Sequence, residues 1–277
     1  MDRTSIIMDG KFASINRPTA GARTLRELPR GEHEIQLYSL GTPNGVKVTI
    51  LLEELGVEYD AWFINILEQD QFTSGFVAMN PNSKIPAMLD YDAGSTKLEG
   101  ATKDLGDDPI RVFESGSILV YLAEKYDRFL PKDIRNRAEV MNWVMFQMGS
   151  APFIGGGFGH FYAYAPVNVE YAINRYSMET KRLLDVLDQH LNGHDYMVGG
   201  ELTIADMALW PWVRALAIDV YPNCSKFLQV ESYHHLMKWY NFLAGRKGFQ
   251  RGVRVNGYKA DAIRERHSKD DFSPDDY

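Results

Sequence analysis

A short motif of a threonine, a proline and an asparagine stands where a strand-like pattern changes into a helix-like one. Pro43 can occupy the first position of the helix, with Thr42 as its N-cap. The N-terminus of a helix carries unpaired N–H groups and the positive end of the helix dipole, so it attracts anions, and a thiolate is such an anion. Thr42 and Asn44 could therefore donate hydrogen bonds to a bound sulfur. The alternative is that they only cap the helix.

A second motif, Lys84-Ile85-Pro86, comes directly before a short apolar run. A peptide bond before proline can adopt the cis form, which bends the chain and leaves the N–H and C=O of Ile85 free. A free strand edge of this kind can pair with the backbone of a bound peptide. Taken alone the motif is a weak signal, because few such bonds are cis in folded proteins.

A third motif, Glu114-Ser115, begins another helical pattern. It places a hydroxyl group and backbone N–H groups at the positive end of a helix dipole, with a carboxylate beside them. These groups match the carboxylate and the ammonium of an α-amino acid. The alternative is a plain helix start with an acid in the first turn.

The pattern of apolar residues predicts the elements that carry these motifs. Residues 34–40 alternate as in a half-buried strand, residues 46–55 have the spacing of a helix that ends at Gly56, and residues 59–65 return to a strand pattern. That order is a βαβ unit. Two short strands joined by a long hairpin loop, and then a helix, complete this half: residues 87–90, 110–113 and 117–126.

The second half of the chain has an almost purely helical pattern, in which Thr203 and Asp206 have the spacing of a capping box. We expect an α/β plus all-α fold, with a thioredoxin-like domain followed by a helical bundle. The final segment is too polar to bury enough area to order itself unaided. The predicted segments are an N-terminal extension at 1–33, the thioredoxin-like domain at 34–130, the all-helical domain at 135–250 and a polar C-terminal tail at 251–277.

Composition and charge exclude several classes of function. Among 277 residues, 30 Lys and Arg stand against 37 Asp and Glu, and the net charge of -7 disfavours nucleic acid as a partner. No stretch approaches the roughly 20 apolar residues of a membrane helix, and the first 30 residues lack the apolar core of a signal peptide. We therefore expect a cytoplasmic protein with no membrane partner.

Cysteine and histidine usage argues against redox and metal motifs. Cys224 is the single cysteine, so the chain can form neither an intramolecular disulfide nor a CxxC motif. His190 and His194 are four residues apart but have no third candidate ligand nearby, so we expect no metal site. The glycine-rich segment 155–160 lacks the ending of a phosphate-binding loop and predicts close packing or a ligand-lined break in a helix.

Several of these segments resemble the glutathione transferase superfamily. TPN after the first strand, NPNSKIPAM and FESGSILVYLAEKY look like its glutathione-binding domain, and GGELTIADMALWPW is similar to a helix of its second domain. More narrowly, TPNG followed by QF, the PFIGGGFGHFYAYAP stretch and YAINRY resemble the bacterial nu class and its relatives among yeast nitrogen-regulator-like proteins. The resemblance covers about residues 10–250, including FASINRP in the extension.

The resemblance implies how glutathione is held. Thr42 and Asn44 match the pair that approaches the glutathione sulfur, so they are the expected catalytic residues. Ile85 matches the residue whose backbone forms hydrogen bonds with the cysteinyl unit. Glu114 and Ser115 match the residues that hold the γ-glutamyl group.

Further binding residues follow from the same resemblance. Lys84 and Pro86 flank the residue that bonds the cysteinyl unit, and Gln71, from the QF pair, reaches the tripeptide. Arg175, from YAINRY, comes from the helical domain towards the thiol. Asn16 in the extension is similar to a position that touches a second glutathione.

Two residues decide whether the protein supplies its own activating group. Tyr38 lies on the first strand, where some other classes have a tyrosine that activates the sulfur, but it precedes the loop by several residues, so we expect a core or pocket-wall role. Cys224 is far in sequence from the motifs, and we expect a buried or incidental thiol. It does not replace the catalytic cysteine of omega-like and glutaredoxin-like relatives.

Three functions fit the predicted site. The first is a glutathione-dependent disulfide-bond oxidoreductase that holds two glutathione molecules, or oxidised glutathione, and reduces small disulfides. The second is conjugation of glutathione to an electrophile bound in an apolar pocket. The third is a non-enzymatic glutathione-binding regulator, as among the yeast relatives. We expect the first, in an enzyme that acts as a homodimer on a small-molecule disulfide.

Overall fold

A computed structural model of the chain describes residue 17, residues 19–92 and residues 109–276. These residues fall into two compact units. The sheet unit comprises Ala20–Arg128 and Arg246–Tyr277, and the helical unit comprises Phe129–Gly245. None of the helices in the described residues is long and apolar enough to cross a membrane.

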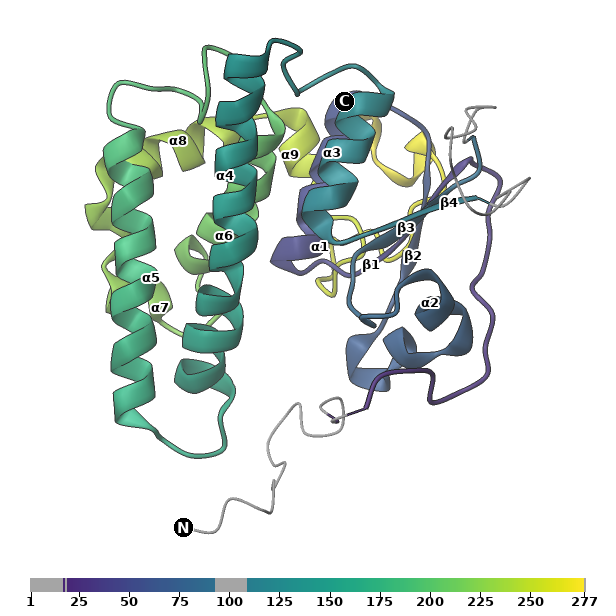
Figure 1. The fold of residues 1–277 in the computed structure, drawn as a ribbon, viewed down its shortest axis with the longest axis horizontal. Helices are drawn as coiled ribbons and strands as arrows, with labels where there is room; N and C mark the ends of the chain where they lie inside the picture. Colours follow the sequence, from purple (N-terminus) through teal and green to yellow (C-terminus); the bar gives the residue numbers. More distant parts are fainter. Residues whose placement is uncertain (1–16, 18, 93–108, 277) are drawn as a thin grey trace. The chain divides into compact units, whose positions relative to one another are not determined.

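A four-stranded mixed sheet forms the centre of the sheet unit (Figure 1). β1 (Ile35–Ser39) runs parallel to β2 (Asp60–Phe63) and antiparallel to β3 (Ala87–Asp90), and β3 pairs antiparallel with β4 (Ile110–Phe113). The strand order is β2-β1-β3-β4, which confirms the predicted βαβ unit and hairpin. All five residues of β1 are buried, rather than the alternate ones that its pattern predicts, because this strand is central in the sheet.

Helices complete the sheet unit. α1 (Pro43–Leu55) and α3 (Ser115–Lys125) pack against each other, while α2 (Ser74–Met79) packs on β3 and β4. Gly56 ends α1 in the left-handed conformation, with φ of 71°, and its N–H donates to the carbonyl of Leu52. The 3-10 turns η1 (Ile66–Glu68) and η2 (Asp70–Phe72) connect β2 to α2.

The C-terminal segment differs from the prediction. The sequence analysis ended the helical domain at residue 250 and set residues 251–277 apart as a tail, whereas the structure assigns Arg246–Tyr277 to the sheet unit. α9 (Lys247–Gly252) packs against α1. Beyond it, Arg266 exchanges two backbone hydrogen bonds with Ala61, at 2.7 and 3.2 Å, on the outer edge of β2. Two 3-10 turns follow: η5 (Lys269–Asp271) and η6 (Pro274–Asp276).

Ion pairs explain why a polar segment packs so closely. Glu53 of α1 accepts a hydrogen bond from Nε of Arg251 at 2.6 Å, and its other oxygen lies 3.6 Å from Nε of Arg266. The side chain of Arg266 is buried and also donates to the carbonyl of Tyr59 at 2.7 Å. Charged groups can be buried when opposite charges and acceptors satisfy them. The partners Glu53 and Arg251 are 198 residues apart, so the local pattern gave no sign of this packing.

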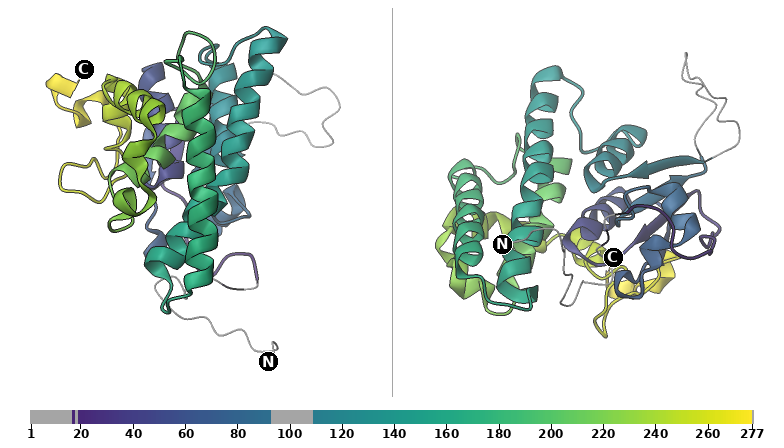
Figure 2. Two further views of the ribbon diagram at one scale, coloured as in Figure 1. Left: turned by 90° about the vertical axis from the view of Figure 1, so that its left-hand side faces the viewer. Right: turned by 60° about the horizontal axis from the view of Figure 1, so that its bottom comes forward.

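Long helices build the helical unit. α4 (Ile134–Pro152) continues into η3 (Phe153–Tyr164), which is a π-helix, and α5 (Glu170–His190) returns alongside them, as Figures 1 and 2 show. α6 (Ile204–Ala217) is almost entirely buried and packs against α4. The remaining elements are α7 (Cys224–Leu228), η4 (Val230–Ser232) and α8 (His234–Ala244).

The glycine-rich segment within η3 is a site of close packing. A Cβ atom at Gly157 would collide with the ring of Tyr176, and one at Gly159 would collide with the ring of Tyr221. Without side chains at these positions, the aromatic rings lie directly on the helix backbone. The sequence predicted either close packing or a ligand-lined break in a helix for this segment, and the structure shows close packing.

The start of α6 has the predicted capping box. Thr203 accepts a hydrogen bond from the backbone N–H of Ala205, and the Asp206 carboxylate accepts one from the backbone N–H of Thr203 at 3.0 Å. The same buried carboxylate also accepts from the backbone N–H of Met197 at 2.8 Å and from Nε1 of Trp239 at 2.9 Å. Asp206 thus links α6 to α8 and to the loop before α6.

Candidate active site

The junction of β1 and α1 forms the first side of the candidate site. Thr42 is the N-cap of α1, with φ of -84° and ψ of 165°, and Pro43 occupies the first turn, as predicted. The Oγ1 atom of Thr42 accepts from the backbone N–H of Gly45 at 3.5 Å. Gly45 must be a glycine, because a Cβ there would collide with the carbonyl oxygen of Leu40. The helix can therefore begin directly at the end of the strand.

The loop before β3 forms the second side. The peptide bond between Ile85 and Pro86 is cis, as the motif allows. Nδ2 of Asn80 donates to the carbonyl of Lys84 at 2.7 Å, which holds the loop. Since β3 begins only at Ala87, the N–H and C=O of Ile85 lie before the strand pairing and can serve a ligand.

The start of α3 forms the third side. Glu114 is the residue before the helix and has a φ of 69° and a ψ of 122°, a rare conformation for a residue with a side chain. Nδ2 of Asn82 donates to Oε1 of Glu114 at 3.1 Å, so the carboxylate is held towards the loop before β3. Ser115, the first residue of α3, is buried. The prediction that a helix begins at this motif is confirmed.

A cavity of about 150 Å³ lies between these three sides. Two helix N-termini and the Lys84 ammonium favour negative charge in it, whereas the Glu114 carboxylate favours positive charge. Such a cavity suits a ligand that carries an amine, a carboxylate and a further anionic group. The predicted site residues that line it are Asn44, Lys84, Ile85, Pro86, Glu114 and Ser115. Asn80 and Asn82, which were not predicted, complete the lining.

The other predicted residues lie elsewhere. Thr42 caps α1 two residues before Asn44 without lining the cavity, and Gln71 is buried in η2, where its Nε2 donates to the carbonyl of Ile66 at 3.2 Å. Arg175 belongs to α5 of the helical unit, and its guanidinium lies 3.7 Å from the Glu179 carboxylate. Asn16 lies outside the described residues. The ligand-binding roles of all the predicted site residues, including Gln71, Arg175 and Asn16, stay predictions.

The structure adds Lys47, which the sequence analysis missed. This residue of α1 is fully buried, and its Nζ donates to Oδ1 of Asn44 at 2.9 Å and to Oγ of Ser115 at 3.2 Å. Burial lowers the pKa of Lys47 to about 7, although the Glu114 carboxylate raises it in part. The available signal was a lysine within an apolar run, three residues after Asn44 and so on the same face of the helix.

Tyr38 belongs to the core, as expected. Its side chain is buried among Ile64, Phe76 and Met79, and its hydroxyl donates to the carbonyl of Pro29 at 2.6 Å. Burial raises the pKa of Tyr38 far above the ordinary value. A phenol with these properties is a structural group of the sheet unit.

Replacing Cys224 by serine is expected to leave activity close to that of the wild type. The thiol is buried in the helical unit, where Sγ lies 3.4 Å from the carbonyl of Leu216, and burial raises its pKa to about 11. At neutral pH the group is therefore a protonated thiol, which is a poor nucleophile. Steady-state kinetics would check this, with circular dichroism as the control for folding. Loss of most activity in a folded Cys224→Ser protein would show that the protein uses its own thiol.

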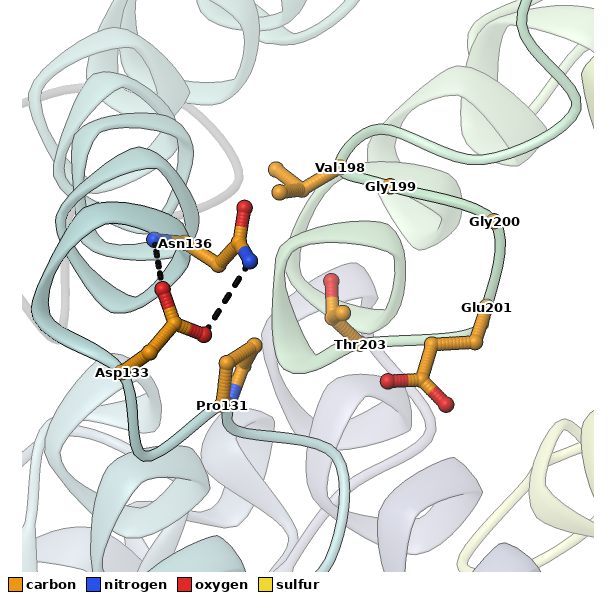
Figure 3. A pocket seen from close by; sticks show the side chains of 8 residues that line it. All are labelled: Pro131, Asp133, Asn136, Val198, Gly199, Gly200, Glu201 and Thr203. Atoms are coloured by element: carbon orange, nitrogen blue, oxygen red, sulfur yellow. Dashed lines mark hydrogen bonds between the residues drawn. The ribbon is translucent and has the colours of Figure 1, made fainter.

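A larger pocket in the helical unit is a poor match for such a ligand (Figure 3). Its volume is about 350 Å³, and the Asp133 carboxylate at its edge accepts hydrogen bonds from the backbone N–H and Nδ2 of Asn136. The lining has two carboxylates and no basic side chain, which disfavours an anion. Among the described residues, no group of three or more His, Cys, Asp and Glu side chains could hold a metal ion. The lining residues are Pro131, Asp133, Asn136, Val198, Gly199, Gly200, Glu201 and Thr203.

The fold and the sequence together define the class of protein: the chain belongs to the glutathione S-transferase family. The family model of the N-terminal domain matches residues 42–125, and that of the C-terminal domain matches residues 141–247. The predicted fold, a thioredoxin-like domain followed by a helical one, is confirmed.

Particular relatives narrow the class. The chain is 52% identical over 272 residues to the disulfide-bond oxidoreductase YghU of Escherichia coli, which covers 95% of this chain and 90% of that protein. A glutathione transferase YghU from Streptococcus pneumoniae, solved in complex with glutathione, is 48% identical, with a TM-score of 0.84 over 94% of this chain and 97% of that one. A glutathione transferase from Pseudomonas putida, solved with one glutathione disulfide per subunit, is 38% identical, with a TM-score of 0.72 over 82% of this chain and 94% of that one.

Proposed function

We propose that this protein is a glutathione-dependent disulfide-bond oxidoreductase that uses the thiols of glutathione in place of a catalytic cysteine. The observation that carries the proposal is the cavity, which joins the N-termini of α1 and α3 to the free backbone of Ile85. The relatives support it, since one is named for this activity and others were solved with glutathione or its disulfide.

Glutathione fits the cavity in one direction. The Ser115 hydroxyl and the N-terminus of α3 bind the γ-glutamyl carboxylate, and the Glu114 carboxylate binds its ammonium. The backbone of Ile85 pairs with the cysteinyl unit. The sulfur then lies at the N-terminus of α1, where Thr42 and Asn44 donate to the thiolate and lower the pKa of the thiol.

Two glutathione molecules complete the reaction. The first thiolate attacks one sulfur of a small disulfide, so a mixed disulfide with glutathione forms and one thiol of the substrate leaves. The second glutathione attacks the glutathione sulfur of the mixed disulfide, which yields oxidised glutathione and releases the second thiol. We assign Gln71 to the glutathione tripeptide, Arg175 to the thiol region and Asn16 to the second glutathione.

Conjugation to an electrophile is the second candidate, because it needs the same thiolate. The feature that favours it is the aromatic surface of η3, where Phe153 is exposed and Phe161 and Tyr164 are partly exposed. An apolar electrophile could bind such side chains. A non-enzymatic regulator would keep the cavity without turnover.

Assays run side by side distinguish these functions. We expect reduction of 2-hydroxyethyl disulfide by glutathione to be much faster than conjugation of chloro-dinitrobenzene, and calorimetry to give two glutathiones per chain. Faster conjugation with one glutathione per chain would favour the transferase. Tight binding without either activity would favour the regulator.

Replacing Ser115 by alanine is expected to raise the KM for glutathione, by about ten-fold, with a smaller change in kcat. The hydroxyl donates to the γ-glutamyl carboxylate equally in the ground state and in the transition state, and one hydrogen bond to a charged group has about this value. Calorimetry measures the affinity directly. An unaltered affinity would remove Ser115 from the site.

Replacing Asn16 by alanine is expected to weaken the second glutathione and to slow disulfide reduction, while the first glutathione binds as before. Deletion of residues 1–30 would be a poorer test of the extension. It would also remove Pro29, whose carbonyl accepts the hydrogen bond of the buried Tyr38 hydroxyl. Calorimetric stoichiometry and reductase kinetics provide the test. Wild-type values for both would remove Asn16 from the site.

We also propose that the enzyme is a homodimer that works in the cytoplasm. Met145 on α4 and Tyr171 and Met178 on α5 are exposed apolar side chains of the helical unit, which favours an interface there. The single free cysteine and the need for reduced glutathione suit the cytoplasm. Light scattering would report the mass, and a monomer at micromolar concentration would overturn the dimer.

A further inference from the structure

A buried lysine side chain lies directly behind two lining residues of the candidate site. The Nζ atom of Lys47 is 2.9 Å from Oδ1 of Asn44 and 3.2 Å from Oγ of Ser115. One of these acceptors is on α1 and the other begins α3, and both line the cavity. The side chain of Lys47 has no exposed surface, and a buried ammonium is costly to keep.

The two hydrogen bonds decide which way each side chain points. An asparagine amide has an acceptor end and a donor end, so Oδ1 of Asn44 facing Lys47 turns the Nδ2 donors away from it. A hydroxyl has a single proton, and an Oγ atom that accepts from an ammonium directs this proton elsewhere. Because both residues line the cavity, each can then offer a donor to a ligand. A thiolate and a carboxylate, both acceptors, need donors at these two places.

The protonated form of Lys47 adds a positive charge to this orientation. It lies in the second turn of α1, so it reinforces the positive end of that helix. Burial opposes the protonation of Lys47, and the Glu114 carboxylate just before α3 favours it. An anionic ligand in the cavity would favour the protonated form of Lys47, and the protonated form would in turn favour the anionic ligand.

We propose that Lys47 is a positioning residue for glutathione, which acts through Asn44 and Ser115 to orient the donor to the thiolate and the donor to the γ-glutamyl carboxylate together. This inference rests on the proposed function. It couples the central thiol of the bound tripeptide to its γ-glutamyl end through one side chain that does not touch the ligand.

Two substitutions separate the hydrogen bonds of Lys47 from its charge. In Lys47→Met both are lost, and we expect the KM for glutathione to rise about ten-fold or more, the value of one hydrogen bond from a charged group. The pKa of the bound thiol, measured from the ultraviolet absorbance of the thiolate, should rise as well. Lys47→Gln keeps an amide donor without the charge, so both the KM and the thiol pKa should return part of the way to the wild-type values.

Thr49→Val is the matched control. Thr49 is also buried on α1, but its hydroxyl donates at 2.7 Å to the carbonyl of Gly252, away from the cavity. We expect this variant to lose thermal stability while its KM and thiol pKa stay at the wild-type values. A change in the two site parameters as large as that of Lys47→Met would show that any buried polar group of α1 has this effect, and would overturn the proposal.

A double-mutant cycle tests whether Lys47 acts through Asn44. If it does, Lys47→Met combined with Asn44→Ala should be little worse in thiol pKa than the more damaging single variant, because each removes the same interaction. Additive effects would overturn the proposal. So would wild-type KM and thiol pKa in Lys47→Met, or in Lys47→Gln if the methionine variant does not fold. The proposed function fails separately, if Asn44→Ala and Ser115→Ala themselves leave glutathione binding and turnover unchanged.

Discussion

Replacing both Thr42 and Asn44 by alanine is expected to lower the kcat for disulfide reduction by about 10²- to 10³-fold, with a much smaller change in the KM for glutathione. In the proposed mechanism the two side chains donate to the sulfur, where negative charge must be stabilised for attack. Glu114 and Ser115 also line the cavity and are unchanged in this variant, so the proposed contacts with the γ-glutamyl group remain and binding should persist. Steady-state kinetics with glutathione and 2-hydroxyethyl disulfide would measure both parameters.

The control for this variant addresses folding. Thr42 is also the N-cap of α1, and loss of a cap costs about 1 kcal/mol of stability, so thermal unfolding must show that the variant is folded. Ser115→Ala is the matched comparison, since it should change KM rather than kcat. A double variant with wild-type kcat would exclude Thr42 and Asn44 from the chemical step.

Replacing Asp206 by alanine is expected to lower the free energy of unfolding by about 3–5 kcal/mol. Its carboxylate accepts from the backbone N–H groups of Thr203 and Met197 and from the indole of Trp239, all in a buried region. Each buried donor that loses its acceptor costs about 1–3 kcal/mol, so the sum is large. Denaturant unfolding followed by circular dichroism would measure the loss.

Asp133 offers the matched control, because it caps α4 of the same unit from an exposed position. Asp133→Ala removes a comparable carboxylate from a helix N-terminus, but water replaces the lost bonds, and about 1 kcal/mol is expected. Equal losses in the two variants would mean that the buried links to Met197 and Trp239 add nothing to the capping box.

The motifs of the cavity could be predicted because their signals are local. Thr42 and Pro43 start α1, and Glu114 stands directly before α3, since capping and helix-start chemistry depends on a few neighbouring residues. Lys47 could not be predicted as a site residue, because its hydrogen bond to Ser115 joins residues that are 68 positions apart in the sequence. An apolar run that contains one lysine predicts a helix, and the lysine becomes informative only when its partner is known.

The prediction of a separate C-terminal tail was wrong for a similar reason. Its composition is that of a solvated tail, yet Arg251 and Arg266 are buried against Glu53 of α1. Polar composition predicts disorder only when the charges have no partners elsewhere in the chain. The capping box of Thr203 and Asp206, by contrast, is complete within four residues and was predicted in full.

Titration of glutathione bound to the Cys224→Ser variant tests the central claim most directly. Cys224 is the single cysteine of the chain, so in this variant all thiolate absorbance comes from the ligand. If the N-terminus of α1 with Thr42 and Asn44 stabilises the thiolate, the pKa of the bound thiol should lie at least about one unit below the ~8.5 of a free thiol. A bound thiol that titrates at the same pH as free glutathione would contradict a mechanism based on thiolate activation at this site.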